Sequence, residues 1–299
     1  HVAAGPTLIH QLVGIALAGQ AAGVVADLAE RPDAPNLYWA LTTLPRPLID
    51  LRGAAEWEYR MLEMQFPDLA DLDRDRPAGQ WDVALRRYRT GIREIAFEGA
   101  GADRKLPDWF PKTYAPDAPA ADSPDLPAAR AFVGRTAGLS AEQVAAMPPA
   151  RVLLRYTLGG YRERRDLVFR AFYLPPAQAL PLIRASDKLL LEPPQTEGQL
   201  AARVFLPAVA RVVSAQARAD RNLSALRVVE ALRMYAAAHD GRLPDRLGDM
   251  TETPLPDDPG TGKPFVYTRA GDTSTITSQV PDDPIARSGI RYRVTVRKK

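Results

Sequence analysis

Cysteine is absent from this chain of 299 residues, and histidine occurs only three times. The lack of cysteine excludes disulfide bridges, thiolate nucleophiles, and zinc or iron–sulfur sites with cysteine ligands. It leaves the cellular compartment open, because an exported protein need not contain disulfides. None of His1, His10 and His239 has a serine and a carboxylate at a spacing that suggests a catalytic triad.

The motifs of several enzyme classes are missing as well. The chain contains no G-x-S-x-G, H-E-x-x-H or G-x-G-x-x-G pattern. The segment GTGK at 260–263 lacks the earlier glycine of a phosphate-binding loop, and Pro264 follows where that loop has serine or threonine. We therefore predict no nucleotide cofactor. A carboxylate-based enzyme remains open, because two acids suffice for glycoside hydrolysis.

Charge is balanced along the chain instead of concentrated in one region. There are 39 Lys and Arg residues and 36 Asp and Glu residues, which gives a net charge of +3. The two signs are interspersed, which argues against a nucleic-acid partner. Residues 161–170 are locally basic, but Glu163 and Asp166 offset part of that charge, so we interpret them as a solvated helix face.

Residues 6–30 contain no Lys, Arg, Asp or Glu before Asp27. The length of this stretch is that of a membrane span. Two glutamines and His10 interrupt it, and much of it is alanine and glycine, so we interpret it as a buried helix of a soluble bundle. Membrane association through residues 7–26 is the alternative.

Apolar periodicity predicts a helical region of about 220 residues. Helices are expected at 6–30, 36–66 with a break at Pro45–Pro47, 80–98, 148–173, 177–192 and 196–221. Ser140 and Gln143 form a predicted capping box. The helix at 80–98 is expected to place Arg86, Arg87, Arg89 and Arg93 on its outer face. Residues 99–127 are rich in proline and predict a long loop.

Four aspartates between two predicted helices have a spacing close to that of a calcium-binding EF-hand loop. They are Asp71, Asp73, Asp75 and Asp82. The loop needs a sharp turn at its sixth position, where Arg76 stands, and a glutamate at its twelfth, where the shorter Asp82 stands. We therefore favour a solvated acidic linker over a calcium site, and we predict no other metal or cofactor here.

Residues 222–268 carry the clearest local signals in the chain. Apolar residues at helical spacing lead to Gly241, which can adopt the left-handed conformation of a helix C-cap, and Pro244 follows. Short runs at 265–267, 273–277 and 290–296 read as strands. One long helix packed on a small antiparallel sheet is the predicted result.

The order of motifs in this stretch resembles the globular part of type II secretion pseudopilins. The matching residues are Tyr235, Asp240, Gly241, Arg242, Pro244, Leu247, Pro256, Asp258, Pro259, Gly262, Pro264, Phe265 and Tyr267. The resemblance implies a pseudopilin-like fold for 222–299 and a bias toward export. Some pseudopilins bind calcium in a late acidic loop, and Asp282 and Asp283 stand near that place. More than two hundred residues precede the module, so pilus assembly does not carry over.

Residues 36–52, NLYWALTTLPRPLIDLR, resemble a segment of uncharacterised secreted bacterial proteins. The helical periodicity and the helix-plus-sheet signals together predict a mainly α protein, with a helical region at 1–221 and a small α+β module at 222–299. The expected role is structural or protein-binding, in an exported bacterial protein of the periplasm or cell envelope, with proteins of an envelope or secretion assembly as partners. The alternatives are a cytoplasmic protein, and a hydrolase with a carboxylate site between the helical region and residues 99–127.

Overall fold

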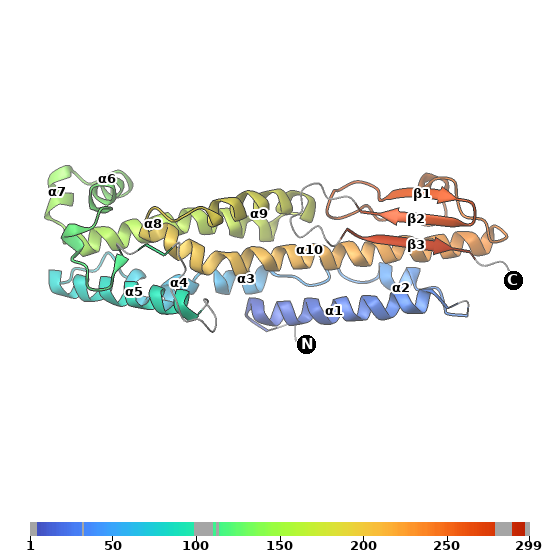
Figure 1. Ribbon diagram of the computed structural model, residues 1–299, viewed down its shortest axis with the longest axis horizontal. Coiled ribbons are helices and arrows are strands. Elements are labelled where there is room, and N and C mark those ends of the chain that lie inside the picture. The colour runs from blue at the N-terminus through green and yellow to red at the C-terminus, as the bar shows by residue number, and fades with distance from the viewer. Residues whose placement is uncertain (1–4, 32, 99–109, 112–113, 279–288, 297–299) are drawn as a thin grey trace. The chain divides into compact units, whose positions relative to one another are not determined.

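The computed structural model describes residues 5–31, 33–98, 110–111, 114–278 and 289–296 (Figure 1). These residues form ten α-helices and one three-stranded antiparallel sheet, which confirms the predicted mainly α fold with a small α+β part. The chain divides into two compact units. Unit 1 contains residues 1–55, 171–184 and 211–299, and unit 2 contains residues 56–170 and 185–210.

Unit 1 contains α1 (Leu8–Ala29), α2 (Tyr38–Thr42), β1 (Val266–Ala270), β2 (Thr273–Thr277) and β3 (Arg291–Thr295). Unit 2 contains α4 (Met61–Gln65), α5 (Ala78–Glu98), α6 (Leu126–Ala137), α7 (Ala141–Ala146) and α8 (Pro149–Arg170). Three helices contribute residues to both units: α3 (Arg52–Glu58), α9 (Pro176–Leu191) and α10 (Glu197–Ala238). Short 3-10 helices occur at Pro67–Leu69, Ala120–Asp122, Ala171–Tyr173 and Leu247–Asp249.

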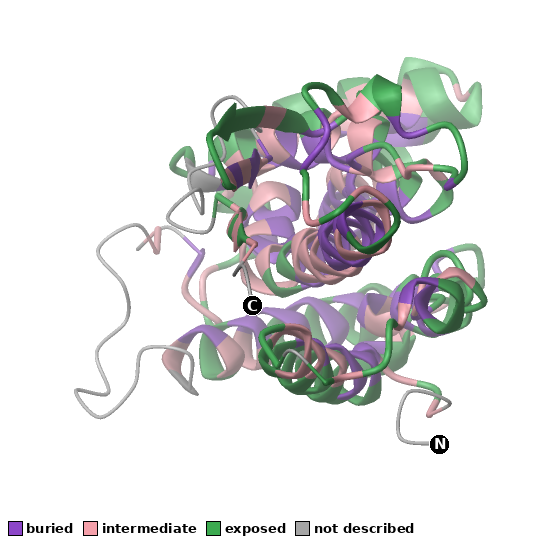
Figure 2. Ribbon diagram, turned by 90° about the vertical axis from the view of Figure 1, so that its right-hand side faces the viewer, coloured by how far each residue is buried: buried purple, intermediate pink, exposed green. Residues whose placement is uncertain are grey.

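The core of unit 1 lies between the C-terminal part of α10 and the sheet. The strand order is β1-β2-β3, and Ile276 of β2 pairs with Tyr267 on one side and Tyr292 on the other. Ile276 is fully buried, together with Val228, Leu232 and other residues of one α10 face. Figure 2 shows buried residues on α10 and exposed residues on the strands. Burial of this apolar stripe is what holds helix and sheet together.

The end of α10 follows the predicted cap chemistry. Asp240 and Gly241 have positive φ angles of 53° and 75°. This left-handed turn lets the Gly241 N–H donate a hydrogen bond to the Ala236 carbonyl oxygen at 2.8 Å, so a helix carbonyl is satisfied as the chain reverses. The capping box at Ser140 is also confirmed, with both reciprocal hydrogen bonds to Gln143 present.

The compact units divide the chain differently from the predicted regions 1–221 and 222–299. α10 continues through Asn222 to Ala238, so the boundary between the two predicted regions falls inside one helix. Residues 1–55 and 171–184 pack in the same unit as the sheet, so unit 1 is assembled from three separate chain segments.

The core of unit 2 lies where α8 packs against α5 and α6, with Trp81, Leu154 and Tyr161 fully or almost fully buried. The prediction that Arg89 lies on the outer face of α5 is wrong. Its side chain is buried and bonded to Glu197, which lies 108 positions later and whose proximity no local pattern reveals.

Gly198 marks a close approach of α10 to α8 inside unit 2. A Cβ atom at Gly198 would lie 2.5 Å from the Thr157 carbonyl oxygen and 3.1 Å from the Gly160 Cα. Since these are backbone atoms, we expect Gly198→Ala to lower the free energy of unfolding by about 1–3 kcal/mol in urea titrations. Gly79→Ala in α5 is the matched control, because nothing lies within 4 Å of its added Cβ. Equal stability of the two variants would contradict the tight contact.

Candidate functional site

Residues 36–52 lie antiparallel to α10 within unit 1, and hydrogen bonds along the helix hold them. In chain order the contacts are Asn36 Nδ2 to the Glu230 carbonyl oxygen (2.8 Å), the Leu37 N–H to Glu230 Oε2 (3.0 Å), Arg227 Nε to Thr42 Oγ1 (3.2 Å), the Leu48 N–H to Asp220 Oδ1 (3.0 Å) and Gln216 Nε2 to the Ile49 carbonyl oxygen (2.6 Å). Between Thr42 and Leu48 stand Pro45 and Pro47, which have no N–H to donate. A pocket opens at this point.

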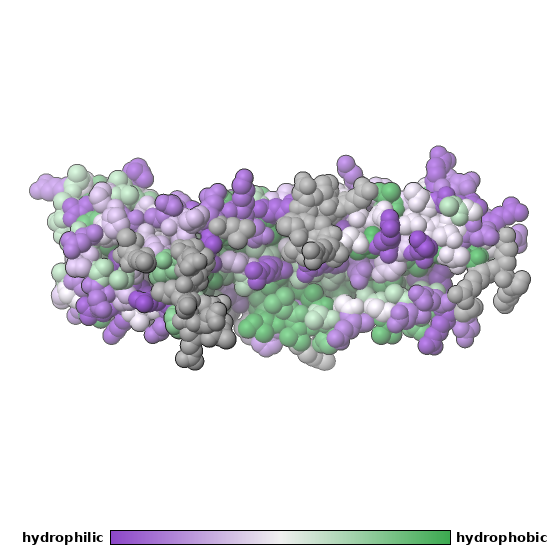
Figure 3. Space-filling view, in the orientation of Figure 1, coloured by the Kyte–Doolittle hydropathy of each residue, from purple (hydrophilic) through white to green (hydrophobic). Residues whose placement is uncertain are grey.

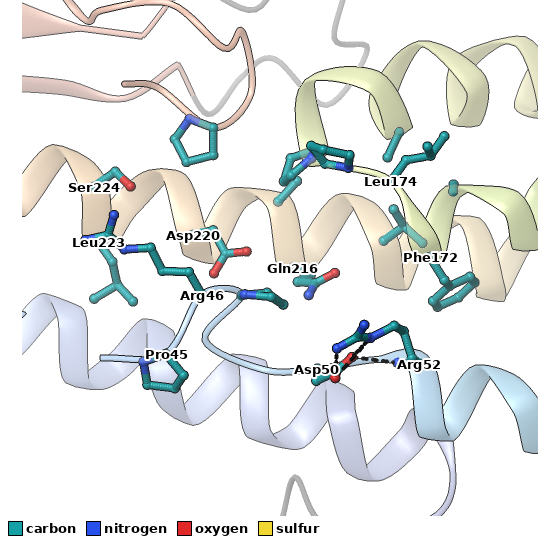
Figure 4. Close-up of a pocket in the computed structure, with 18 of the residues that line it drawn as sticks. Pro45, Arg46, Asp50, Arg52, Phe172, Leu174, Gln216, Asp220, Leu223 and Ser224 are labelled. Atoms are coloured by element: carbon teal, nitrogen blue, oxygen red, sulfur yellow. Dashed lines mark hydrogen bonds and ion pairs between the residues drawn. The ribbon is translucent and has the colours of Figure 1, made fainter. Parts of the chain in front are cut away.

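The pocket has a volume of about 510 Å³ and lies entirely in unit 1. Residues 41–52, residues 171–179 and the part of α10 from Val213 to Arg227 supply most of its wall (Figure 4). Its larger apolar side chains are Leu41, Leu44, Pro45, Pro47, Phe172, Leu174, Pro175, Pro176, Val213 and Leu223. Both the volume and the mostly apolar wall are typical of small-molecule sites.

Five charged side chains line this pocket: Arg46, Asp50, Arg52, Asp220 and Arg227. Asp50 and Arg52 pair with each other at 2.6 Å, and the hydrogen bond from Arg52 holds the pKa of the Asp50 carboxyl below its ordinary value. Burial raises the pKa of Asp220, although the Leu48 N–H opposes this shift. Three arginines and two aspartates leave the lining with a net charge of +1.

Arg227 is the unusual member of this set, because its side chain is only 5% exposed. Its guanidinium lies 5.8 Å from the centre of the Tyr38 ring, and its Nε donates to Thr42. In the part of the chain that the structure describes, Nη1 is buried without a hydrogen-bond partner, and no carboxylate forms an ion pair with Arg227. A buried charge in this state is costly unless something compensates it.

A second feature of unit 1 is the exposed apolar surface of α1. Two described helices, α1 and α10, are long and apolar enough to cross a membrane, but 50% of the apolar stretch of α10 is buried against 17% for α1. Ile9, Leu12, Val13, Leu17 and Val24 of α1 are exposed. The apolar surface is visible along α1 in Figure 3. The interpretation of residues 6–30 as a buried helix is therefore corrected: the helix forms, but most of its surface has no protein cover.

The four aspartates with EF-hand-like spacing do not come together in the structure. Asp71 lies 3.6 Å from Arg76 and 3.9 Å from Arg74, and Asp73 pairs with Arg155 of α8. Asp75 precedes α5 and Asp82 lies within it. Among the described residues no three His, Cys, Asp or Glu side chains lie close enough to share a metal ion. Asp282 and Asp283 lie outside the described residues.

The region predicted for a carboxylate-based hydrolase contains a buried polar network of unit 2. Tyr114 donates to Asp125 Oδ2 at 2.9 Å, and Arg89 Nε donates to Glu197 Oε1 at 3.0 Å. The Glu197 N–H links the two pairs by donating to Asp125 at 3.3 Å. Burial raises the pKa of Glu197, and Arg89 opposes that shift. Both carboxylates are buried, and neither lines the pocket of unit 1 or the 250 Å³ pocket of unit 2, so we interpret the network as structural.

No protein-family model, curated protein or solved structure matches this chain. The resemblance of residues 222–299 to pseudopilins, and that of residues 36–52 to secreted bacterial proteins, stay predictions.

Proposed function

We propose that this protein has a structural or protein-binding role at a membrane of the bacterial cell envelope, and that α1 anchors it in the lipid bilayer. The observation that carries the proposal is the apolar, mostly uncovered surface of α1. The helix has 22 residues, which at 1.5 Å per residue gives about 33 Å. This matches a bilayer hydrocarbon core of about 30 Å.

The distribution of side chains on α1 favours a helix that spans the bilayer over one that lies on it. Interfacial helices have a charged face opposite the apolar one. In α1 the exposed Ile9, Val13 and Leu17 stand beside the buried Leu8 and Ile15, and Asp27 in the last turn is its one charged residue. A helix that is apolar all round requires burial, in protein or in lipid.

The packing of α1 on unit 1 is modest. Near its C-terminal end Ala22, Val25 and Ala26 contact Leu41 and Leu226, and all three α1 side chains are small or only partly buried. Five of the 22 residues of α1 are buried, so most of its apolar surface is already free to contact lipid.

The extracytoplasmic location and the envelope partners belong to the same proposal. They are supported by the two resemblances and by the packing of the long helix α10 on a three-stranded antiparallel sheet, which is the arrangement that the pseudopilin resemblance implies.

The test is flotation with phosphatidylcholine vesicles. We expect the full chain to float with the lipid. Val13→Glu combined with Leu17→Glu should lower the partition constant into the vesicles by more than about 1,000-fold, because each carboxylate near a span centre costs about 2.5–3.5 kcal/mol. The two positions are 44% and 49% exposed, so the fold should persist. The control is Met64→Glu combined with Val83→Glu, at similarly exposed apolar positions outside α1.

Two outcomes would overturn the proposal. One is a flotation result in which the wild-type chain stays in the lipid-free fraction, or in which the control variant loses lipid binding as strongly as the α1 variant. The other is found by N-terminal sequencing of the native protein in the soluble and membrane fractions. A soluble chain that begins after α1 would mean that this helix is removed, as a signal sequence is.

A further inference from the structure

The pocket of unit 1 is lined by Arg227, a buried cation that forms no ion pair with a carboxylate of the described residues. The acid nearest to Arg227 along α10, Glu230, is already engaged: it accepts hydrogen bonds from Arg233 at 2.8 Å and from the Leu37 N–H at 3.0 Å. Asp50 is paired with Arg52, and Asp220 accepts from Leu48. Every carboxylate that lines the pocket or lies one turn from Arg227 therefore has another partner. Because Arg227 lines the pocket, an anion bound there can compensate the charge of its guanidinium.

The net charge of the lining limits the charge of the anion that the pocket can neutralise. With Asp50 and Arg52 paired, the remaining charges are Arg46, Arg227 and Asp220, which again sum to +1. One negative charge neutralises this set, whereas a doubly charged phosphate would leave an excess. A planar carboxylate also matches the geometry in which a guanidinium donates hydrogen bonds.

The rest of the pocket requires an apolar body. Phe172, Leu174 and Leu223 lie among the wall residues, and Figure 4 shows Gln216 and Asp220 on α10 on the side of the helix that faces Pro45 and Arg46. Gln216 donates one Nε2 hydrogen to the Ile49 carbonyl oxygen, which holds its amide against residues 36–52. A volume of about 510 Å³ accommodates a medium-length chain or a small ring system.

We propose that this pocket binds an amphipathic monocarboxylate, with its carboxylate at the Arg227 guanidinium and its apolar chain against the proline- and leucine-rich wall formed by residues 41–47 and 171–176. The inference rests on the pairing of Arg227, Asp50, Asp220 and Glu230, in which no side chain of α1 takes part.

The test compares octanoate and octan-1-ol by isothermal titration calorimetry on the full chain and on Arg227→Met. Methionine keeps the length and apolar character of the arginine stem but removes the guanidinium. We expect octanoate to bind Arg227→Met about 10- to 100-fold more weakly than the wild type, as for loss of a charge-assisted hydrogen bond. Octan-1-ol should bind both chains equally and more weakly than octanoate binds the wild type. Any uptake by α1 is common to both chains and cancels in the comparison.

The stability of the variant separates a binding role from a structural one. Since Arg227 is buried without an ion pair, we expect the melting temperature of Arg227→Met to equal or exceed that of the wild type. Arg211→Met, at an exposed position of the same helix, should change neither octanoate affinity nor melting temperature. A large drop in the melting temperature of Arg227→Met would identify a structural arginine and contradict the proposal.

A second variant keeps the test independent of Arg227. Asp220→Asn retains an oxygen for the Leu48 N–H but removes a negative charge two helical turns from Arg227. Because the repulsion of the ligand is reduced, octanoate should bind about three- to tenfold more tightly. Unchanged octanoate affinity in both Arg227→Met and Asp220→Asn, or equal affinity of the wild type for octanoate and octan-1-ol, would overturn the assignment.

Discussion

Replacing Arg221 with methionine is expected to lower the free energy of unfolding by about 3–5 kcal/mol, because the change leaves a carboxylate buried without its cation. Arg221 of α10 is buried, and its Nε lies 3.2 Å from Asp258 Oδ1 and 3.2 Å from Ser278 Oγ. Asp258 is only 1% exposed, so water cannot replace the lost partner. The measurement is urea unfolding of the full chain followed by circular dichroism.

Asp258 also stabilises the turn formed by the Asp258-Pro259 and Gly262-Lys263-Pro264 motifs. Its Oδ1 accepts a hydrogen bond from the Gly260 N–H at 2.9 Å, and its own N–H donates to the Lys263 carbonyl oxygen at 2.8 Å. Residues 258–263 thus form a closed turn, in which Gly262 has a φ of 67°. Because Arg221 holds this turn on α10, its loss is expected to increase hydrogen exchange first at Gly260 and Gly262.

The matched control is Arg211→Met, an exposed arginine on the same helix, for which we expect a change within about 0.5 kcal/mol. Asp258→Asn in the Arg221→Met background should recover part of the loss, since the remaining buried group is then neutral. A stability of Arg221→Met within about 1 kcal/mol of the wild type would contradict the proposed role of the pair.

Replacing Arg89 with methionine should have an effect of similar size in unit 2, again about 3–5 kcal/mol at neutral pH. Arg89 donates to Glu197 and to the Ala118 carbonyl oxygen, the latter at 2.8 Å, so it connects the proline-rich segment to the start of α10. Both side chains of the ion pair are 2% exposed. Arg87→Met, on the same helix but with an exposed side chain, is the control and should be close to neutral.

The defect of Arg89→Met should depend on pH in a defined direction. Burial already raises the pKa of Glu197 in the wild type, and Arg89 is the group that lowers it, so the pKa rises further without Arg89. A carboxyl group with a raised pKa in the folded state favours folding most below its unfolded pKa, and this contribution is lost as pH rises through the folded pKa. The variant should therefore be closer to wild-type stability near pH 4 than at pH 7. A defect that grows toward acid pH would contradict this explanation.

Local chemistry made much of the fold predictable from the sequence. The cap at Gly241, the capping box at Ser140 and the alternation in β2 each depend on residues within a few positions of one another. The positions of Trp81 and Tyr88 on the inner face of α5 follow in the same way from helical periodicity.

The pocket could not be predicted, because its walls come from distant parts of the chain. Asn36 and Glu230, which begin the contact between residues 36–52 and α10, are 194 positions apart. Arginine is usually exposed, and the sequence of α10 gives no sign that Arg227 is buried without a carboxylate. The same limit explains the error at Arg89, whose partner Glu197 is equally remote.

The assembly of unit 1 from three chain segments has a consequence for biosynthesis. A chain emerges from the ribosome starting at its N-terminus, so α1 and residues 36–52 appear long before Leu226 and Glu230, which they contact in the finished protein. Unit 2 consists mostly of the continuous residues 56–170, whose helices can pair during that interval. A nascent chain therefore presents α1 as an uncovered apolar helix while most of the protein is still being made. Targeting factors and chaperones that capture such helices would reach it before α10 does.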